Sequence, residues 1–336
     1  MIIIDGAAGE GGGQVLRSSL ALALVTGKAF RIENIRGGRQ KPGLMRQHVT
    51  AIEAACAIGG ATCEGLALGA GTIAFHPGKV RAGSYRFSIG TAGSTSLVLQ
   101  TVLPPLMMAE GPSRLVLDGG THNPGAPPFE FLAHSFLPRL ARLGPKVEAR
   151  LIRHGFYPAG GGRVEVEIEP APLSPVEFTR GPLRHVTGTA LIAGLPADIA
   201  EREIAAASAE PGLPGATWHL RPLPADLGPG NIISVEAGFD DGCEIVTGFA
   251  ERGTSAEAIG RKAAKRLAGF LATGAFAGPH LADQLLLPLA LAGGGRFTTV
   301  SPTAHSRTNA EVIRRFTGLD VQFTPQADGT HMVTLS

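Results

Sequence analysis

The sequence predicts a mixed α/β (α+β) fold, in which a large domain of three repeated α/β units is interrupted by a smaller inserted α/β domain. The first observation is a recurring order of elements: an apolar helix ending at Gly, a strand, a Gly- or Pro-rich turn, a second helix and a strand pair. The second is unequal spacing of the helix-ending glycines, because 84 positions separate Gly27 from Gly111 but 182 separate Gly111 from Gly293. The third copy therefore contains an insertion of about 98 residues.

The composition fits a globular protein with many tight turns. At 336 residues and 44% apolar residues the chain can bury a large core, and 47 Gly and 25 Pro residues suit short elements joined by turns. The formal net charge is only +2. Contact with RNA or DNA therefore requires a local basic patch.

The first copy follows the apolar run Met1–Ile4. Apolar residues at helical spacing predict a helix over 14–25, which ends at Thr26-Gly27. The elements that follow are a strand over 30–35, a turn over 37–43, a helix over 44–58 and strands within 62–75.

The second and third copies repeat this order. In the second copy we expect a helix over 94–108, a strand over 114–117, a turn over 119–128, a helix over 129–143 and strands within 147–168. In the third we expect a helix over 283–291, a strand over 297–300, a turn over 301–306, a helix over 309–316 and strands within 320–335. If the copies pack alike, residues from the three turns converge on one cleft.

The insertion, residues 179–276, has enough elements for a small α/β domain of its own. We expect strands over 185–192, 232–237 and 244–249, helices over 199–207 and 255–271, and mobile connections at 210–215 and 221–230. The large domain then comprises residues 1–178 and 277–336.

The most informative motif is the Gly-Glu-Gly-Gly-Gly turn at residues 9–13, between the apolar run and the first helix. Consecutive glycines let backbone N–H groups approach an anion, and the start of a helix favours phosphate. Glu10 would repel a polyphosphate unless a divalent cation lay between them. The turn therefore predicts a nucleotide with a metal ion, and a Gly-rich hairpin with an exposed Glu is the alternative.

Common signatures of nucleotide binding are absent from the sequence. Gly27-Lys28 has Leu22 where a P-loop needs its first Gly, and no Gly-x-Gly-x-x-Gly motif follows a strand. None of the lysines precedes x-Asp-Gly, the pattern of ligases with a lysine nucleophile. If a nucleotide is activated covalently, another residue must do it.

A basic stretch between Lys28 and Arg46 has enough local charge to hold phosphates. It contains six cationic residues and the single acid Glu33, and its glycines at 37, 38 and 43 would bring backbone close to a ligand. An ordinary solvated face is the alternative.

His305 is the candidate nucleophile. It lies in the third turn, just before a predicted helix at whose start Thr308 and Glu311 have capping-box spacing. An imidazole at a positive helix end would meet a phosphate there and act as nucleophile or general base. Because the chain has ten histidines, a surface or core role is the ordinary alternative.

The cysteines and the apolar segments indicate the cellular setting. Cys56, Cys63 and Cys243 form no C-x-x-C pair and are expected to be buried thiols in a reducing compartment. No basic segment precedes the apolar start, and apolar segments such as 285–292 are far shorter than the roughly 18 residues of a membrane span. We expect a soluble, cytoplasmic protein.

Six segments together resemble RNA 3′-terminal phosphate cyclases over nearly the whole chain. They are Asp5-Gly6-x-x-Gly9-Glu10-Gly11-Gly12-Gly13-Gln14, Lys41-Pro42-Gly43-Leu44-x-Arg46-Gln47-His48, Gly90-x-Ala92-Gly93-Ser94 before Gln100, His154-Gly155-Phe156-Tyr157-Pro158-x-Gly160-Gly161-Gly162, Ala282-Asp283-Gln284 and His305-x-x-Thr308-Asn309. The resemblance implies a large domain of three units, like the C-terminal domain of a translation initiation factor, with a smaller domain inserted.

The resemblance further implies ATP-dependent conversion of an RNA 3′-phosphate to a 2′,3′-cyclic phosphodiester, a ligase-type nucleotidyl transfer. His305 matches the family's nucleophile, which takes AMP from ATP as adenylyl-histidine and passes it to the RNA as RNA-3′-pp-A. Glu10 matches the acid that contacts Mg²⁺ or Mn²⁺. The implied partners are ATP and RNA with a 3′-phosphate end, and nothing in the sequence indicates a membrane or an obligate protein partner.

Other positions match residues that bind ATP or phosphates, or that support such residues. They are Gln14, Arg17, Arg36, Arg39, Gln47, His48, Gln100, Pro127, His280, Leu281, Ala282, Asp283 and Gln284. His280 departs from relatives that place Tyr against the adenine. An imidazole can still stack, but it buries less apolar area, which puts adenine affinity and base choice in question.

Three alternatives share parts of this picture. A non-catalytic relative that serves ribosome assembly has the fold but lacks the nucleophilic histidine. An enolpyruvyl transferase has related repeats but needs neither ATP nor a histidine nucleophile. A simple RNA-binding module would hold 3′ ends without a covalent intermediate, so ATP consumption and the effect of His305→Ala separate these possibilities.

Overall fold

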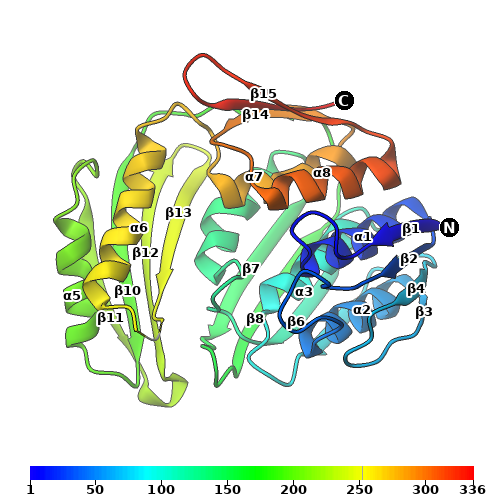
Figure 1. Cartoon of the computed structure of the whole chain (residues 1–336), viewed down its shortest axis with the longest axis horizontal. Coiled ribbons are helices and arrows are strands. Elements are labelled where there is room, and N and C mark those ends of the chain that lie inside the picture. Colours follow the sequence, from blue (N-terminus) through cyan, green and yellow to red (C-terminus); the bar gives the residue numbers. More distant parts are fainter. Residues whose placement is uncertain (252) are drawn as a thin grey trace.

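The structure, a computed structural model, describes residues 1–251 and 253–336, and it is the mixed α/β protein that the sequence predicts. Three sheets with their helices form the larger part. A fourth sheet, with α5 and α6 beside it, forms the part drawn in green and yellow on the left of Figure 1.

The three sheets of the larger part share one topology. Their strand orders are β1-β2-β4-β3, β5-β6-β8-β7 and β9-β14-β16-β15. In each sheet the first two strands are parallel and the other neighbours are antiparallel. Parallel neighbours need a crossover connection, which contains α1, α3 and α7 in turn. The threefold repeat expected from the helix-ending glycines is therefore present in the backbone.

The bounds of these elements follow the sequence prediction in most places, but the strands over 84–88 and 176–177 were not predicted. The strands are β1 Ile2–Asp5, β2 Phe30–Glu33, β3 Thr62–Glu64, β4 Ile73–His76, β5 Ser84–Ser88, β6 Ser113–Gly119, β7 Lys146–Arg153, β8 Gly162–Glu169, β9 Val176–Glu177, β14 Gly295–Thr299, β15 Val321–Pro325 and β16 His331–Leu335. The helices are α1 Gly13–Thr26, α2 Arg46–Gly59, α3 Thr95–Leu106, the π-helix η1 Phe131–Phe136, α4 Leu137–Ala141, α7 Pro279–Leu291 and α8 Ala304–Thr317.

The helix α7 and the helix predicted over 129–143 differ from their predictions near the site. The helix α7 begins at Pro279, four residues before the predicted start, because proline suits the first helical position, where no N–H bond is required. The helix predicted over 129–143 begins instead as the π-helix η1 and continues as α4, which has Pro138 in its first turn. Proline lacks the N–H of a regular helical ladder, so the chain changes register there.

The inserted sheet has the order β11-β10-β12-β13 and one helical layer. Its elements are β10 His185–Ala193, α5 Asp198–Ser208, β11 Thr217–Leu223, the 3₁₀-helix η2 Ala225–Leu227, β12 Gly230–Phe239, β13 Gly242–Phe249 and α6 Ala256–Leu271. The strand β11 was not predicted, and with η2 it occupies most of a stretch expected to be a mobile loop. It lies at the sheet edge, where Pro222 is tolerated because an outward N–H is not needed.

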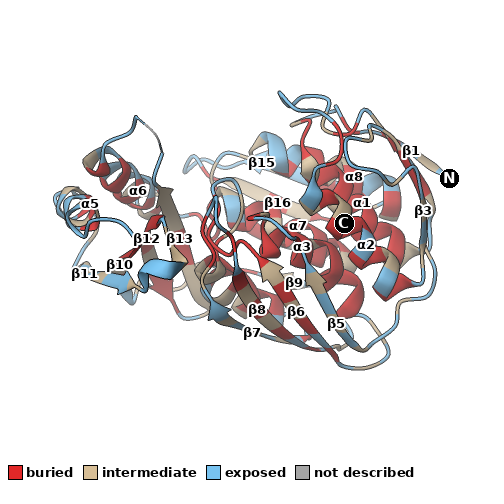
Figure 2. Ribbon diagram, turned by 90° about the horizontal axis from the view of Figure 1, so that it is seen from below, coloured by how far each residue is buried: buried red, intermediate tan, exposed pale blue. Residues whose placement is uncertain are grey.

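The larger part and the inserted part have separate apolar cores. The first core includes Leu20, Val102 and Phe297, one residue from each repeated unit. The second includes Val186 of β10 and Leu267 of α6. Figure 2 shows buried residues along α1, α2 and α7 in the larger part and on the sides of α5 and α6 that face each other and the sheet. Separate cores support two domains, and the boundaries at residues 179 and 276 remain a prediction.

Two further expectations concern the thiols and the membrane. Cys56, Cys63 and Cys243 are unpaired, as expected, but each is partly exposed rather than fully buried. No helix among the described residues combines the length and the apolar character that a membrane crossing requires.

Candidate active site

The Gly-rich turn links β1 to α1 and shapes the start of that helix. Gly9 and Gly11 have positive φ angles of 63° and 59°, which residues with side chains rarely adopt. The backbone N–H of Glu10 donates to Thr308 Oγ1 at 3.1 Å, so the turn is fixed against α8. This hydrogen bond joins the third repeated unit, which contains α8, to the first, which contains the Gly-rich turn.

The next two glycines leave room for polar side chains at the helix start. A Cβ added to Gly12 or Gly13 would collide with four of them, Glu10, Arg39, Arg17 and His48. Three of these come from the turn or α1, or from the loop after β2, and His48 comes from α2. Glycine therefore leaves room for the ends of these side chains where they now lie, and a Cβ at either position would displace them.

His305 lies in the first turn of α8, not before the helix. The helix begins at Ala304, and its N-cap is Thr303, whose Oγ1 accepts from the Ser306 N–H at 3.1 Å. The capping box predicted at Thr308 and Glu311 is therefore wrong, because Thr308 is inside the helix and donates to the Ala304 carbonyl at 2.8 Å. The imidazole is still at the positive end of the helix dipole.

A chain of hydrogen bonds orients His305. Gln14 Nε2 donates to Asp283 Oδ1 at 2.6 Å, and Asn309 Nδ2 donates to the same oxygen at 3.3 Å. With its nitrogen turned to Asp283, Gln14 presents Oε1 to His305 Nδ1, 2.6 Å away. Burial raises the pKa of Asp283, and the bond from Gln14 favours its ionised form.

This chain selects one tautomer of His305. An amide oxygen only accepts hydrogen bonds, so Nδ1 must carry the proton that it donates to Gln14. The lone pair of the neutral imidazole is then on Nε2. That atom lies 3.8 Å from Glu10 Oε2, and the His305 side chain is 52% exposed, so Nε2 is accessible to a reactant.

Glu10 has the features of a metal-binding carboxylate. Its side chain is only 5% exposed; Oε2 pairs with Arg39, and Oε1 is buried with no hydrogen-bond partner among the described residues. An unpartnered carboxylate oxygen in a nearly closed position is costly unless a cation binds it. Mg²⁺ is often held by one or two carboxylates together with substrate phosphates, so the residues present fit such an ion.

The groups around the Gly-rich turn include both charged guanidinium groups and a neutral imidazole. Burial lowers the pKa of Arg17 to about 10, which leaves the guanidinium charged at neutral pH. Burial, with the charges of Arg17 and Arg36, lowers the pKa of His48 to about 3, so its imidazole is neutral. His48 Nδ1 accepts from the Met45 N–H, which leaves Nε2–H as a donor near Gly13. The start of α1 thus offers cations and neutral donors to an anion.

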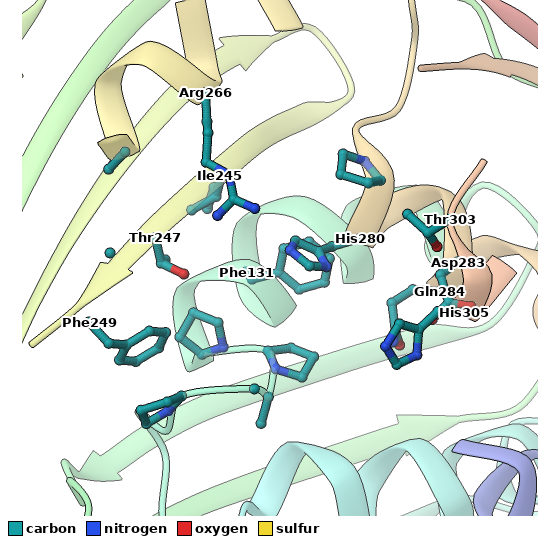
Figure 3. A pocket seen from close by; sticks show the side chains of 18 of the residues that line it. Phe131, Ile245, Thr247, Phe249, Arg266, His280, Asp283, Gln284, Thr303 and His305 are labelled. Atoms are coloured by element: carbon teal, nitrogen blue, oxygen red, sulfur yellow. The ribbon is translucent and has the colours of Figure 1, made fainter. Parts of the chain in front are cut away.

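A cavity of about 400 Å³ opens beside these residues, between the larger part and the inserted part. Its lining includes eight of the residues predicted from the sequence, Gln14, Arg17, Gln100, Pro127, His280, Asp283, Gln284 and His305. Arg17 Nε donates to Gln100 Oε1 at 2.8 Å, which joins α1 to α3 at the cavity. Figure 3 shows His305, Asp283 and Gln284 on one side and Thr247, Phe249 and Arg266 of the inserted part across from them.

Other predicted residues do not line the cavity. Leu281 and Ala282 of α7 are buried in the apolar core of the larger part. Gln47 Oε1 instead accepts from the Ser94 N–H at 3.2 Å, at the start of α3. The remaining predicted residues, Arg36, Arg39 and His48, gather around the Gly-rich turn with Glu10.

The basic stretch of the sequence is dispersed by folding. Lys28 donates to the Phe316 carbonyl at 2.7 Å, and Arg31 pairs with Glu33 at 2.8 Å. Arg36 bonds the carbonyls of Lys41 and Gly43 at 2.6 and 3.0 Å, so it also shapes its own loop. Only part of the stretch is therefore available to a ligand at the turn.

The cavity wall supplied by the inserted part was not predicted from the sequence. Ile245, Thr247 and Phe249 of β13, with Lys262 and Arg266 of α6, line the cavity. The basic residues at 261, 262, 265 and 266 were the available indication, because a helix places 262 and 266 on one face. Burial and the charge of Arg266 lower the pKa of His280, so this wall keeps that imidazole neutral.

Comparison with known proteins gives two findings. A family model described as RNA 3′-terminal phosphate cyclase matches residues 8–323. A curated RNA 3′-terminal phosphate cyclase from Koribacter versatilis (strain Ellin345) is 50% identical over 318 residues, which cover 94% of this chain and 90% of that relative. The family match spans the Gly-rich turn, the inserted part and α8.

Proposed function

The chain belongs to the RNA 3′-terminal phosphate cyclase family, and we propose that it is a ligase-type enzyme that converts an RNA 3′-terminal phosphate to a 2′,3′-cyclic phosphodiester at the expense of ATP. The observation that carries this proposal is the presentation of His305 Nε2. The Asp283–Gln14 pair binds the Nδ1 side of His305, so the lone pair of the imidazole is on Nε2. Glu10 Oε2 lies 3.8 Å from this Nε2.

The first step is nucleophilic attack by His305 Nε2 on the α-phosphorus of ATP. The bond to pyrophosphate breaks, and AMP remains on the imidazole as adenylyl-histidine. The ring becomes positive as the new bond forms, because Nδ1 keeps its proton. Gln14 Oε1, supported by Asp283, accepts from that proton and stabilises the developing charge.

In the second step an oxygen of the RNA 3′-phosphate attacks the adenylyl phosphorus. The P–N bond breaks, His305 regains its lone pair, and the RNA carries a 3′-pp-A end. The adjacent 2′-hydroxyl then loses its proton and attacks the 3′-phosphorus, and AMP leaves. The need for a 2′-hydroxyl restricts this last step to RNA.

The residues around the cavity divide into two binding roles. Arg17, Arg39 and His48 would contact phosphates at the start of α1, where the helix dipole adds to their effect. Pro127 and His280, which line the same cavity, would enclose the adenine. A neutral His280 can stack on a base without the cost of burying a charge.

A divalent cation, Mg²⁺ or Mn²⁺, would be held by Glu10, whose buried Oε1 needs a partner. When bound, it would offset the negative charge of the triphosphate. Arg39 pairs with the other oxygen and holds the carboxylate in place. A cation held by Glu10 would lie near His305, because Glu10 Oε2 is 3.8 Å from His305 Nε2.

The test is incubation with α-labelled ATP and Mg²⁺ or Mn²⁺, followed by denaturing electrophoresis. We expect acid-labile label on the wild type, none on His305→Ala, and full label on the control His76→Ala, which changes a histidine in β4 outside the cavity lining. Added RNA with a 3′-phosphate should then gain a phosphatase-resistant cyclic end. Equal label on His305→Ala would assign another nucleophile, and no label on folded wild type with metal would overturn the covalent mechanism.

A further inference from the structure

Three side chains that could hold a metal ion lie at or near the ends of the loop 124–128, which lines the cavity. His122 follows β6, Glu130 immediately precedes η1, and His154 follows β7. One ligand atom from each of the three lies within 4.8 Å of the others. Neither the adenylyl transfer nor the binding roles above use these residues.

The His122 imidazole is held in the orientation of a metal ligand. Its side chain is fully buried, and Nε2 lies 2.9 Å from Glu130 Oε2 and 3.2 Å from Oε1. At a metal–nitrogen bond of about 2.0 Å, neighbouring ligands of a tetrahedral ion are about 3.3 Å apart, so these atoms need to move little. Thr121 Oγ1, 2.7 Å from Nδ1, can accept the other ring proton.

The Thr121 hydroxyl is itself held in place, since it accepts from the Gly155 N–H at 2.9 Å. A ligating histidine usually donates its second N–H to such a fixed oxygen, which leaves the opposite nitrogen free for the metal. The segment that supplies this support also carries His154, the next residue back. The orientation of both imidazoles therefore depends on the same stretch of backbone.

His154 supplies the observation that an ordinary ion pair leaves unexplained. Its Nε2 is buried and has no hydrogen-bond partner among the described residues. The ring stacks on His122, with centroids 5.2 Å apart and planes 20° apart. A buried imidazole nitrogen without a partner is costly, and coordination to a cation would remove that cost.

The donor set fits one class of ion. Two imidazoles and one carboxylate, with a position left for water, are a recurrent set for Zn²⁺ and similar divalent transition metals, whereas Mg²⁺ and Ca²⁺ prefer oxygen. We propose that His122, Glu130 and His154 form a binding site for Zn²⁺ or a similar divalent transition metal.

The position of this site suggests what it would stabilise. Residues Pro124–Pro128, between His122 and Glu130, line the cavity. A metal bound at both ends of this loop and at His154 would fix the loop to the β7–β8 region. Phe156, two residues after His154, packs with Leu191 and Ile232 of the inserted part, so the site lies near the junction of the two parts.

The cluster of His185, Glu236 and Cys243 also has residue types that bind metals, and it differs from the cluster of His122, Glu130 and His154. Glu236 is already satisfied, because it accepts from Cys243 at 3.1 Å and pairs with His134 and His185 at 3.2 and 3.3 Å. Burial and the neighbouring Glu236 raise the pKa of Cys243 to about 12, so the thiol keeps its proton. This cluster carries no orphaned atom and serves as the control.

The test is titration of metal-stripped protein with Zn²⁺ against a chromophoric chelator, in buffer with millimolar Mg²⁺. We expect one equivalent bound by the wild type, by His185→Ala and by His305→Ala, and an affinity at least about 100-fold weaker for His154→Ala and Glu130→Gln. Co²⁺ in place of Zn²⁺ should give the visible bands of tetrahedral coordination in the wild type, His185→Ala and His305→Ala, and should not give them in His154→Ala or Glu130→Gln.

Thermal unfolding keeps the test decisive if a variant folds poorly. Zn²⁺ should raise the unfolding temperature of wild type and of His185→Ala, and leave that of His154→Gln unchanged. No tight equivalent in the wild type would overturn the proposal. Binding that survives His154→Ala but is lost in His185→Ala or His305→Ala would also overturn it, because the metal would then belong to the other cluster or to the active site.

Discussion

The two walls of the cavity differ in how their polar side chains are held. On the wall made by α1, α7 and α8, Asp283, Gln14 and His305 form an unbroken hydrogen-bonded chain. On the wall made by the inserted part, Lys262 and Arg266 reach the cavity with no side-chain hydrogen bond or ion pair to other described residues. The first wall is preorganised, which suits a chemical step, and the second has cations available to order around a charged substrate.

With His305 in place, the largest loss is expected from Gln14→Leu. The substitution removes the acceptor of the Nδ1 proton and leaves Asp283 without its closest donor. We expect the single-turnover rate of adenylylation to fall about 10²–10⁴-fold, as when an imidazole loses its orienting group, with ATP affinity nearly unchanged. The matched control is Gln322→Leu, which breaks an exposed Gln–Asp bond in β15. An adenylylation rate of Gln14→Leu equal to that of the wild type would show that the hydrogen-bonded chain does not support the chemical step.

The next effect is expected from Glu10→Gln. The amide keeps the shape of the side chain but removes the charge that a cation requires, so adenylylation should fall about 10²-fold and need more Mg²⁺ for half-maximal rate. Rates measured across a Mg²⁺ series provide the check, with Glu33→Gln, an exposed acid paired with Arg31, as the control. An unchanged Mg²⁺ dependence would place the cation elsewhere.

The same contrast between the walls explains what the sequence could predict. The sequence could single out the Gly-rich turn and His305 as candidates because anion binding and nucleophilic attack require particular residue types, and glycine leaves room for the side chains that gather at the turn. The repeat and its insertion could be predicted because helix ends at glycine recur along the chain. The fold class, an α/β protein with the family's architecture, followed from these features.

The inserted wall could not be found in this way. Thr247 and Phe249 are ordinary strand residues, and only the packing of β13 beside the cavity gives them a role. Likewise Gln14 was expected only as a polar support. Gln14 links Asp283 to His305, although it precedes them in the sequence by 269 and 291 positions, and no local sequence pattern contains such a relation.

A smaller effect, which sharpens the contrast, is expected from Arg266→Ala. Loss of one cation that faces the cavity should weaken substrate binding about 10-fold, while the single-turnover rate at saturation stays within about twofold. Measured KM and kcat for ATP and for RNA will show which substrate the inserted wall contacts. Arg261→Ala, on the same helix but outside the cavity lining, is the control. A fall in kcat alone would mean that this wall takes part in the chemistry.

The smallest effect on activity, and a clear one on stability, is expected from Glu203→Gln in α5. Burial raises the pKa of Glu203 from its ordinary 4.5 to about 7, against a bond from Asn231 at 2.7 Å. Between those values the folded protein holds a proton that the unfolded chain has released. The contribution of Glu203 is therefore full below about pH 4.5 and is lost as the pH rises through about 7.

Glutamine has no proton to lose and keeps the contact with Asn231. At about pH 8.5 the free energy of unfolding of Glu203→Gln should exceed that of the wild type by about 1–3 kcal/mol, and the difference should shrink toward pH 5. Denaturant unfolding at several pH values measures it, with exposed Glu201→Gln on the same helix as the control. Adenylylation should not change, because Glu203 lies in the core of the inserted part and outside the cavity lining. A changed rate would mean that the inserted part influences the wall made by α1, α7 and α8 as well as substrate binding.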